Sequence, residues 1–211
     1  MQLSLLKHQE NVLFLKQIVT GNEKWILYNN VEWKRLWGKQ NETLPTTPKA
    51  GLHPKKVKLC RWWDWKGVLY YELLPENQTT NFNKYCSQWD QLKDALDKKC
   101  PELVNRKRII FHQYNARPHV SLMSGQKLLL SGWEILIHPL YSADIAPLDF
   151  HLFWSLKNSL NGKSFNSLQD CIMPLEQFFA QKDKKFWQDR IMKLPKKWQK
   201  VLEQNGEYFA Q

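Results

Sequence analysis

The side chains best suited to chemistry in this sequence lie around a few short motifs. Arg117 and His119 follow the end of a predicted strand. There they either contact a phosphate or flank the start of the next helix, and spacing alone favours neither. Asp149 directly precedes an apolar run, so on spacing alone it is better explained as a helix N-cap than as a catalytic carboxylate. Asn22 follows Gly21 as in an ordinary turn. None of these residues identifies a reaction by itself.

Five segments of the sequence together resemble the catalytic domain of mariner transposases. Two of them contain Asn-Ala-Arg-Pro-His at 115–119 and His-Pro-Leu-Tyr-Ser-Ala-Asp at 138–144, which are highly specific in combination. The other segments are 19–25, 52–57 and 198–208. The resemblance runs from about residue 12 to the C-terminus. It implies a ribonuclease-H-like fold and an ancestral activity of metal-dependent DNA strand cleavage and integration.

Three aspartates hold divalent metal ions in the mariner family, and the resemblance carries their positions to Asn22, Tyr114 and Asp149. The first family aspartate follows Thr-Gly, which is Thr20-Gly21 here. The second precedes Asn-Ala-Arg-Pro-His and the third lies shortly after Ala-Pro, with the family's spacing between them intact. Only Asp149 is still an aspartate.

The two replacements matter because phosphodiester cleavage of this kind needs a pair of Mg²⁺ or Mn²⁺ ions, about 4 Å apart, held by hard oxygen ligands. Asn22 offers a neutral amide oxygen, which is a weak ligand at best. The Tyr114 phenol has an ordinary pKa of about 10 and is uncharged at neutral pH. Asp149 therefore remains the one charged ligand of the set. We expect no productive metal binding and no metal-dependent cleavage.

A neighbouring carboxylate is the alternative source of a metal ligand. Glu23 is adjacent to Asn22, but consecutive residues of a strand point to opposite faces of the sheet. Asp144 precedes Asp149 in a predicted loop and is the remaining candidate. His112 follows the apolar Phe111 and is better explained as a hydrogen-bonded core histidine than as a ligand.

The charge balance favours a polyanionic partner. The chain carries 31 Lys and Arg against 20 Asp and Glu, a formal net charge of +11, and such a surface neutralises phosphates and releases their counterions. Together with the resemblance, this predicts mainly non-specific contacts to the DNA backbone. The basic stretch 182–200 is better explained as a solvated face over core aromatic residues. The expected DNA-binding residues are Lys55, Lys56, Arg106, Lys107, Arg108, Arg117 and His119.

Cysteine usage and hydropathy bear on the compartment. The four cysteines are widely spaced, without a Cys-x-x-Cys pair, which indicates reduced thiols rather than a zinc or redox motif. No signal sequence or membrane-spanning apolar run of about 18 residues is present. We expect a soluble, non-secreted protein in the nucleus or cytoplasm. The lysine cluster at 54–58 is either a short nuclear-localisation signal or a strand whose lysines alternate outward.

Apolar periodicity predicts the secondary structure. Strands are expected at 24–31, 33–37, 57–63, 68–74, 108–112 and 133–137, with a hairpin turn at 64–67. Helices are expected at 82–99, 119–130, 150–160, 167–182 and 184–204, the fourth interrupted by Pro174 and the last broken at Pro195. This order predicts an α/β fold with a mixed sheet flanked by helices, compatible with a ribonuclease-H-like fold.

The domain organisation follows from the same alignment of motifs. We expect a lead-in at 1–20 and a transposase-like catalytic domain at 21–211. The two helix-turn-helix units that precede this domain in the family have no counterpart in the sequence, so sequence-specific recognition of transposon ends is not expected. Family members act as dimers, which makes a homodimer one expected assembly. Three functions remain open: a non-catalytic DNA-binding domain, a residually active transposase or endonuclease, and a remnant without a role.

Overall fold

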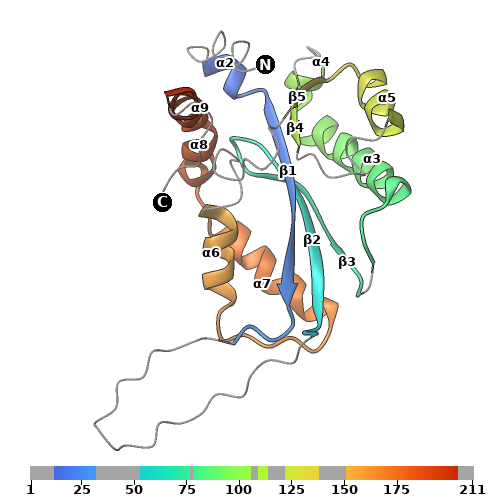
Figure 1. Ribbon diagram of the computed structural model, residues 1–211, viewed down its shortest axis with the longest axis vertical. Helices are drawn as coiled ribbons and strands as arrows, with labels where there is room; N and C mark the ends of the chain where they lie inside the picture. Colours follow the sequence, from blue (N-terminus) through green and yellow to red (C-terminus); the bar gives the residue numbers. More distant parts are fainter. Residues whose placement is uncertain are drawn as a thin grey trace, which may run out of the picture.

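The computed structural model describes residues 12–31, 53–76, 78–105, 109–113, 122–137 and 151–203. Its centre is a five-stranded sheet with the order β3-β2-β1-β4-β5 (Figure 1). The first three strands form an antiparallel meander, and β4 and β5 run parallel to β1. The mixed sheet expected from the sequence is therefore confirmed. The strands are β1 (Ile18–Leu27), β2 (Lys56–Trp63), β3 (Val68–Leu74), β4 (Ile110–Gln113) and β5 (Glu134–Ile137).

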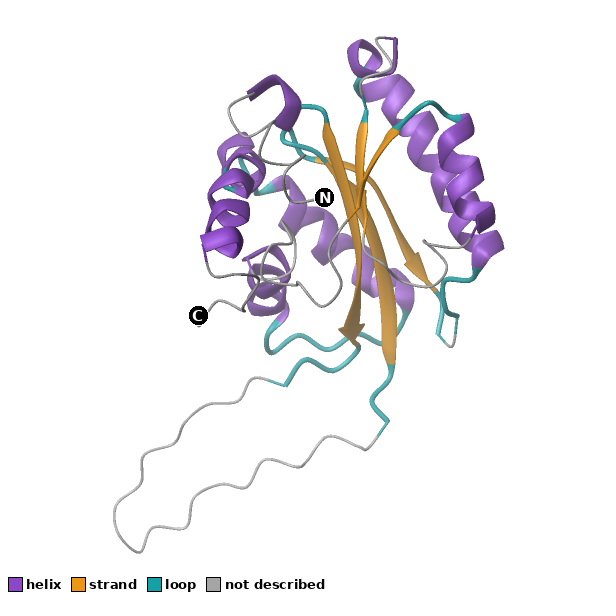
Figure 2. Cartoon of the chain, turned by 45° about the horizontal axis from the view of Figure 1, so that its top comes forward, coloured by secondary structure: helices purple, strands orange, loops and turns teal. Residues whose placement is uncertain are grey.

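Helices cover both faces of the sheet (Figure 2). One face, called the α3 face below, packs against α3 (Phe82–Lys99), α4 (Pro101–Asn105) and α5 (Leu122–Leu130). The opposite face, called the α7 face, packs against α2 (Val12–Leu15), α6 (His151–Leu160), α7 (Leu168–Ala180), α8 (Lys184–Met192) and α9 (Leu194–Glu203). None of the described helices is long and apolar enough to cross a membrane.

Strand alternation divides the core into two clusters, one on each face of the sheet. In β2, Leu59 and Trp63 pack toward the α7 face, whereas Cys60 and Trp62 pack toward the α3 face. This is the two-residue periodicity of a pleated strand. Tryptophan supplies much of the buried volume, as the composition predicted. Buried tryptophans among the described residues are Trp62, Trp63, Trp89, Trp133, Trp187 and Trp198.

The predicted hairpin and the long helix after it are both confirmed. Asp64 Oδ1 accepts the backbone N–H groups of Lys66 and Gly67 at 2.8 and 3.0 Å. Gly67 has a φ of 152°, a conformation that favours glycine. The helix α3 has the predicted bounds. Its N-cap Asn81 accepts the backbone N–H of Lys84 at 2.9 Å, and its predicted apolar stripe is buried.

The start of β1 differs from the prediction. The strand begins at Ile18, inside the expected lead-in, and ends at Leu27. Ile18 packs on the α7 face and Val19 on the α3 face. Because both are buried, this end of the strand lacks the apolar–polar alternation by which half-buried strands are recognised. The antiparallel neighbour of β1 is β2, and the strand predicted at 33–37 lies outside the described residues. The short helices α2 and α4 were not predicted.

Helix α7 runs without interruption through Pro174, so the predicted interruption is wrong. A capping box formed by Ser167 and Asp170 fixes its first turn. Cys171, Leu175 and Phe178 are buried along its inner side, and this packing holds the helix together despite the missing N–H. The break predicted at Pro195 is confirmed, since α8 ends at Met192 and α9 begins at Leu194. The remaining predicted elements agree closely with the described ones.

Candidate metal and DNA site

The first of the three candidate ligand positions, Asn22, lies in the middle of β1. It pairs with Arg61 of β2 and is half-buried. Its Oδ1 accepts the backbone N–H of Glu23 at 2.7 Å. The preceding Gly21 has no room for a side chain, because a Cβ there would lie 2.3 Å from the Trp62 ring. This close approach explains the glycine of the Thr-Gly motif.

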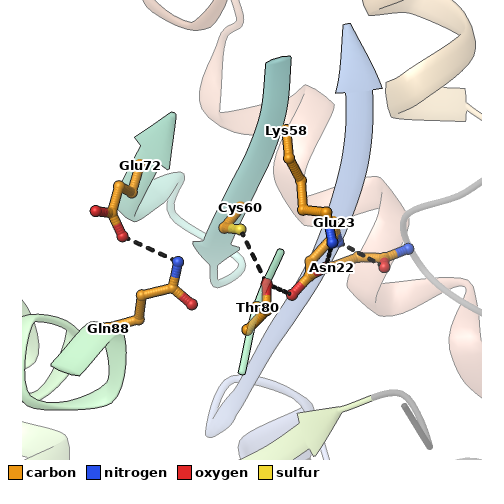
Figure 3. A network of polar contacts seen from close by, with 7 residues as sticks. All are labelled: Asn22, Glu23, Lys58, Cys60, Glu72, Thr80 and Gln88. Atoms are coloured by element: carbon orange, nitrogen blue, oxygen red, sulfur yellow. Dashed lines mark hydrogen bonds and ion pairs between the residues drawn. The ribbon is translucent and has the colours of Figure 1, made fainter. Parts of the chain in front are cut away.

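Glu23 points to the α3 face, away from Asn22, as strand alternation predicted (Figure 3). Its two carboxylate oxygens accept hydrogen bonds from the Thr80 hydroxyl at 2.6 Å and from the Lys58 Nζ at 2.9 Å. The side chains of Lys58 and Glu23 are only 13% and 22% exposed. Glu23 is thus an internal ion-pair partner and does not supply the carboxylate missing at position 22.

A second ion pair lies on the same face. The Glu72 carboxylate accepts hydrogen bonds from Lys84 Nζ and from Gln88 Nε2, the latter at 2.9 Å. Figure 3 shows the contact between Glu72 and Gln88. Cys60 lies between Glu23 and Glu72 in the strand register. Burial, followed by the nearby Glu23 charge, raises the pKa of the Cys60 thiol to about 12. All four cysteines are free thiols, which agrees with the expectation of reduced cysteines.

Arg61, directly opposite Asn22, lies in a different environment on the α7 face. Its side chain is fully buried, and its guanidinium lies 5.9 Å from the Phe153 ring, 5.0 Å from Phe179 and 5.4 Å from Trp187. None of its three side-chain nitrogens has a hydrogen-bond partner in the described part of the chain. Burial lowers the pKa of this guanidinium, but a delocalised guanidinium retains its proton in proteins. Position 22 therefore faces a buried positive charge.

The neighbouring strand on the other side of β1 places a histidine on the α7 face. Thr20 of β1 pairs with His112 of β4 in parallel register, and the Thr20 Oγ1 lies 3.0 Å from the His112 Nδ1. Both side chains are buried. The prediction of a hydrogen-bonded core histidine is confirmed. No group of three or more histidine, cysteine or acidic side chains within the described ranges could hold a metal ion.

Several predicted site residues lie outside the described residues, so their predictions stay untested. Among the candidate metal ligands these are Tyr114 and Asp149, together with the alternative carboxylate Asp144. Among the expected DNA-binding residues they are Arg106, Lys107, Arg108, Arg117 and His119.

The two described DNA-binding candidates, Lys55 and Lys56, lie beside an exposed tryptophan. Trp25 of β1 is 39% exposed. Lys56 and Lys58 place their Nζ atoms 4.6 and 5.0 Å from its ring. Lys55 and Lys56 are exposed, and Val57 between Lys56 and Lys58 is buried. The alternation expected for a strand is therefore present. A surface pocket here is lined by Trp25, His53, Pro54, Lys55, Lys56, Glu76 and Thr79; we call it the Trp25 pocket.

The predicted core of the C-terminal basic stretch is confirmed. Trp187 and Trp198 are buried in the cluster on the α7 face, and Phe186 packs against it. Lys184 is exposed and lies 4.6 Å from the Trp65 ring, while Lys193 is exposed to solvent. Lys182 and Lys184 thus lie over aromatic rings, and Lys185, Lys193, Lys196 and Lys200 are exposed.

Two residues of this region were missed from the sequence. Arg61 was overlooked, although alternation from Val57 and Leu59 to Trp63 puts position 61 on the same buried face. The expectation that arginine is exposed concealed that signal. Trp25 was placed in a strand without a role. The neighbouring Lys24 and the basic segment 54–58 could together have suggested a basic surface around this aromatic ring.

Comparison with known proteins defines the class of this domain. Residues 27–106 match the family described as "Transposase (partial DDE domain)". A solved structure of the Mos1 transposase catalytic domain with Raltegravir and Mg is similar, with a TM-score of 0.82 and 36% identity over 99% of this chain and 93% of that chain. The ribonuclease-H-like fold is confirmed. The domain belongs to the class of transposase catalytic domains.

The particular family follows from the relatives. The chain is 38% identical to the Mariner Mos1 transposase of Drosophila mauritiana over 97% of its length and 39% identical to the human histone-lysine N-methyltransferase SETMAR over 98%. A pre-cleavage Mos1 transpososome is also similar, with a TM-score of 0.93 and 38% identity over 99% of this chain and 61% of that chain. This chain belongs to the mariner transposase family. It spans 60% of the Mos1 transposase and 30% of SETMAR.

Mos1 paired end complexes have been solved with Mg and with Mn, so the ligand set of this chain can be tested against such ions. Asn22 supplies a neutral amide oxygen that already accepts the Glu23 backbone N–H. Its direct cross-strand neighbour is a buried arginine. Divalent magnesium requires several hard, mostly anionic oxygen ligands. The residues around position 22 do not fit a pair of divalent ions.

Proposed function

We propose that this chain is a mariner-derived domain that binds DNA through its basic surface and has lost metal-dependent strand cleavage. The observation that carries the second part is the identity and surroundings of Asn22. This residue occupies the first aspartate position of the family, bonds its amide oxygen to the backbone and faces a buried positive charge. Tyr114 at the second position adds a neutral side chain where the family has a carboxylate.

The Trp25 pocket supports the DNA-binding part of the proposal. Lys55 and Lys56 are exposed there beside the Trp25 ring. Lysines bind phosphates of any sequence, and an exposed aromatic ring offers a stacking surface for an unpaired base. Affinity should therefore depend steeply on salt and weakly on DNA sequence.

The cleavage part is tested with supercoiled plasmid DNA in Mg²⁺ or Mn²⁺. We expect the native chain to leave the plasmid intact over hours at micromolar protein. Calorimetric titration with MnCl₂ should likewise show no saturable site at millimolar concentrations. Metal-dependent nicking that follows the protein through purification would contradict the proposal and favour a residually active endonuclease.

The binding part is tested by fluorescence anisotropy on a short duplex and on a single strand at several salt concentrations. The double variant Lys55→Ala/Lys56→Ala should bind about tenfold more weakly at low salt, and the slope of log K against log salt should shrink by about two. The variant Lys193→Ala/Lys196→Ala removes the same charge from exposed positions near the junction of α8 and α9 and serves as the matched control. Equal effects of the two double variants would rule out a DNA surface at the Trp25 pocket.

A further inference from the structure

The Arg61 side chain has no counter-charge in the described structure. The four described ion pairs involve other lysines and acids. Its neighbour on β3, Tyr71, donates its hydroxyl hydrogen to Glu176 at 2.9 Å. The Arg61 guanidinium is instead surrounded by the rings of Phe153, Phe179 and Trp187. Aromatic faces stabilise a cation, but they supply no negative charge.

Strand geometry places this charge beside the first ligand position. Asn22 and Arg61 are directly paired in the antiparallel ladder of β1 and β2. Directly opposite residues have side chains on the same face of the sheet, with Cβ atoms about 5 Å apart. Because Arg61 is fully buried, its guanidinium cannot turn into solvent without opening the packing of α6, α7 and α8. The positive charge is fixed in place.

We propose that Arg61 acts as a built-in cation that excludes divalent metal from the family's ligand position, independently of the two lost aspartates. A carboxylate restored at position 22 pairs with Arg61 and is neutralised before a metal ion can use it. The proposal deepens the proposed loss of cleavage by adding a residue that neither the family motif nor the aspartate positions identify. Its physical basis is simple repulsion, since a divalent ion within about 8 Å of a fixed unit charge is strongly disfavoured inside a protein.

The test compares metal binding in two restored variants. Asn22→Asp/Tyr114→Asp recovers three carboxylates with Asp149 but keeps Arg61. The second variant adds Arg61→Met, which keeps a long apolar side chain and removes the charge. Calorimetric titration with MnCl₂ should give at least about 100-fold tighter binding for the triple variant, because a repulsive charge has been removed. Equal affinity of the two restored variants would overturn the proposal.

The matched control is Arg190→Met in the Asn22→Asp/Tyr114→Asp background. Arg190 is also partly buried and lies 4.2 Å from the ring of Phe186, but it belongs to α8 and does not pair with β1. Its removal should leave the manganese affinity within about twofold, since a charge on a side chain that is only partly buried is screened by solvent and salt. A gain as large as that from Arg61→Met would show a general charge effect and would overturn the specific role of Arg61.

A second measurement needs no metal and no triple variant. In the native background, Asn22→Asp should raise the melting temperature by about 3 °C or more, because it gives Arg61 a counter-charge. In the Arg61→Met background the same substitution should bring no increase. This double-mutant comparison isolates the pairing, and additive effects of the two substitutions would contradict it.

The two proposals can fail separately. Cleavage or saturable metal binding by the native chain contradicts the proposed loss of function, whatever Arg61 does. Failure of Arg61→Met to change metal affinity or the effect of Asn22→Asp contradicts only the role of Arg61. The native chain and the restored variants therefore report on different claims.

Discussion

The α3 face and the α7 face of the sheet accommodate buried charge in opposite ways. On the α3 face, the Glu23 carboxylate accepts hydrogen bonds from Thr80 and Lys58, and Glu72 is paired in the same manner. On the α7 face, the Arg61 guanidinium is more deeply buried and has no hydrogen-bond partner among the described residues. Glu23 and Arg61 both lie near the centre of the β1–β2 pair. The alternation of side chains along each strand therefore decides which face of the sheet each charge meets.

The difference shows what makes an internal charge tolerable. Burial of a charge costs several kcal/mol unless opposite charge and hydrogen bonds compensate it. On the α3 face, the N-terminal part of α3 supplies Lys84 and Gln88, and the segment before it supplies Thr80. On the α7 face, the helices supply aromatic rings to Arg61. That second face also carries Asn22, so the replaced ligand lies beside a charge that has no hydrogen-bond partner within the described ranges.

The largest effect is expected from breaking the compensated pair. Glu23→Gln leaves Lys58, whose side chain is 13% exposed, without its described ion-pair partner and should destabilise the fold by about 2–3 kcal/mol. Urea denaturation followed by tryptophan fluorescence measures this. The control is Glu102→Gln, which breaks the exposed pair with Lys66 and should cost at most about 0.5 kcal/mol. Similar losses in both variants would mean that the α3 face gains nothing from its internal pairing.

The packing of the α3 face gives the next largest effect. Gly21→Ala places a Cβ 2.3 Å from the Trp62 ring, so the ring or the strand must shift, and we expect a loss of about 2 kcal/mol. Gly125→Ala in α5 is the matched control, because nothing lies within 4 Å of its added Cβ. It should stabilise the protein by about 0.5–1 kcal/mol through helix propensity. A neutral Gly21→Ala would show that Trp62 is loosely held.

The helix that covers Arg61 offers a test in the stabilising direction. Pro174 lies inside α7, where it lacks the N–H of a helical hydrogen bond, so Pro174→Ala should raise stability by about 1–2 kcal/mol. Pro195→Ala serves as the control, because Pro195 lies in the first turn of α9, where a missing N–H costs little. A loss of stability in Pro174→Ala would indicate that the α7 face depends on the proline's rigidity.

Sequence patterns predicted the α3 face better than the α7 face. The spacing of Tyr85, Trp89, Leu92 and Leu96 located α3 to its end residues, because a helix with one buried side leaves a clear periodic signal. In contrast, the periodic pattern at Pro174 was interpreted as interrupted. Local propensity opposed a helix there, and the tertiary packing of Cys171 and Phe178 overrode it. The parts that depend on packing between distant segments were the least predictable.

The candidate site was also predicted only as far as contacts between distant segments were not involved. The motifs identified Asn22 as the first ligand position, and alternation correctly turned Glu23 away from it. They did not identify Arg61, because its importance arises from cross-strand pairing with a residue far away in the chain. Charge is expected at the surface by default. Only the register of β1 and β2 shows that this arginine and Asn22 are neighbours.

The smallest effect, and the one that depends on pH, concerns the Cys60 thiol between the two acidic residues of the α3 face. Burial, followed by the Glu23 charge, raises its pKa from 9.0 to about 12. The folded chain therefore keeps a proton that the unfolded chain loses above pH 9. This contribution to stability is complete below pH 9 and is lost as the pH rises toward 12, by about 1 kcal/mol at pH 10.

Cys60→Ala should flatten the fall of the unfolding free energy between pH 8 and 10, measured by urea titration at each pH. If Cys60→Ala keeps the slope of the native chain, burial beside Glu23 does not hold this thiol in its protonated form.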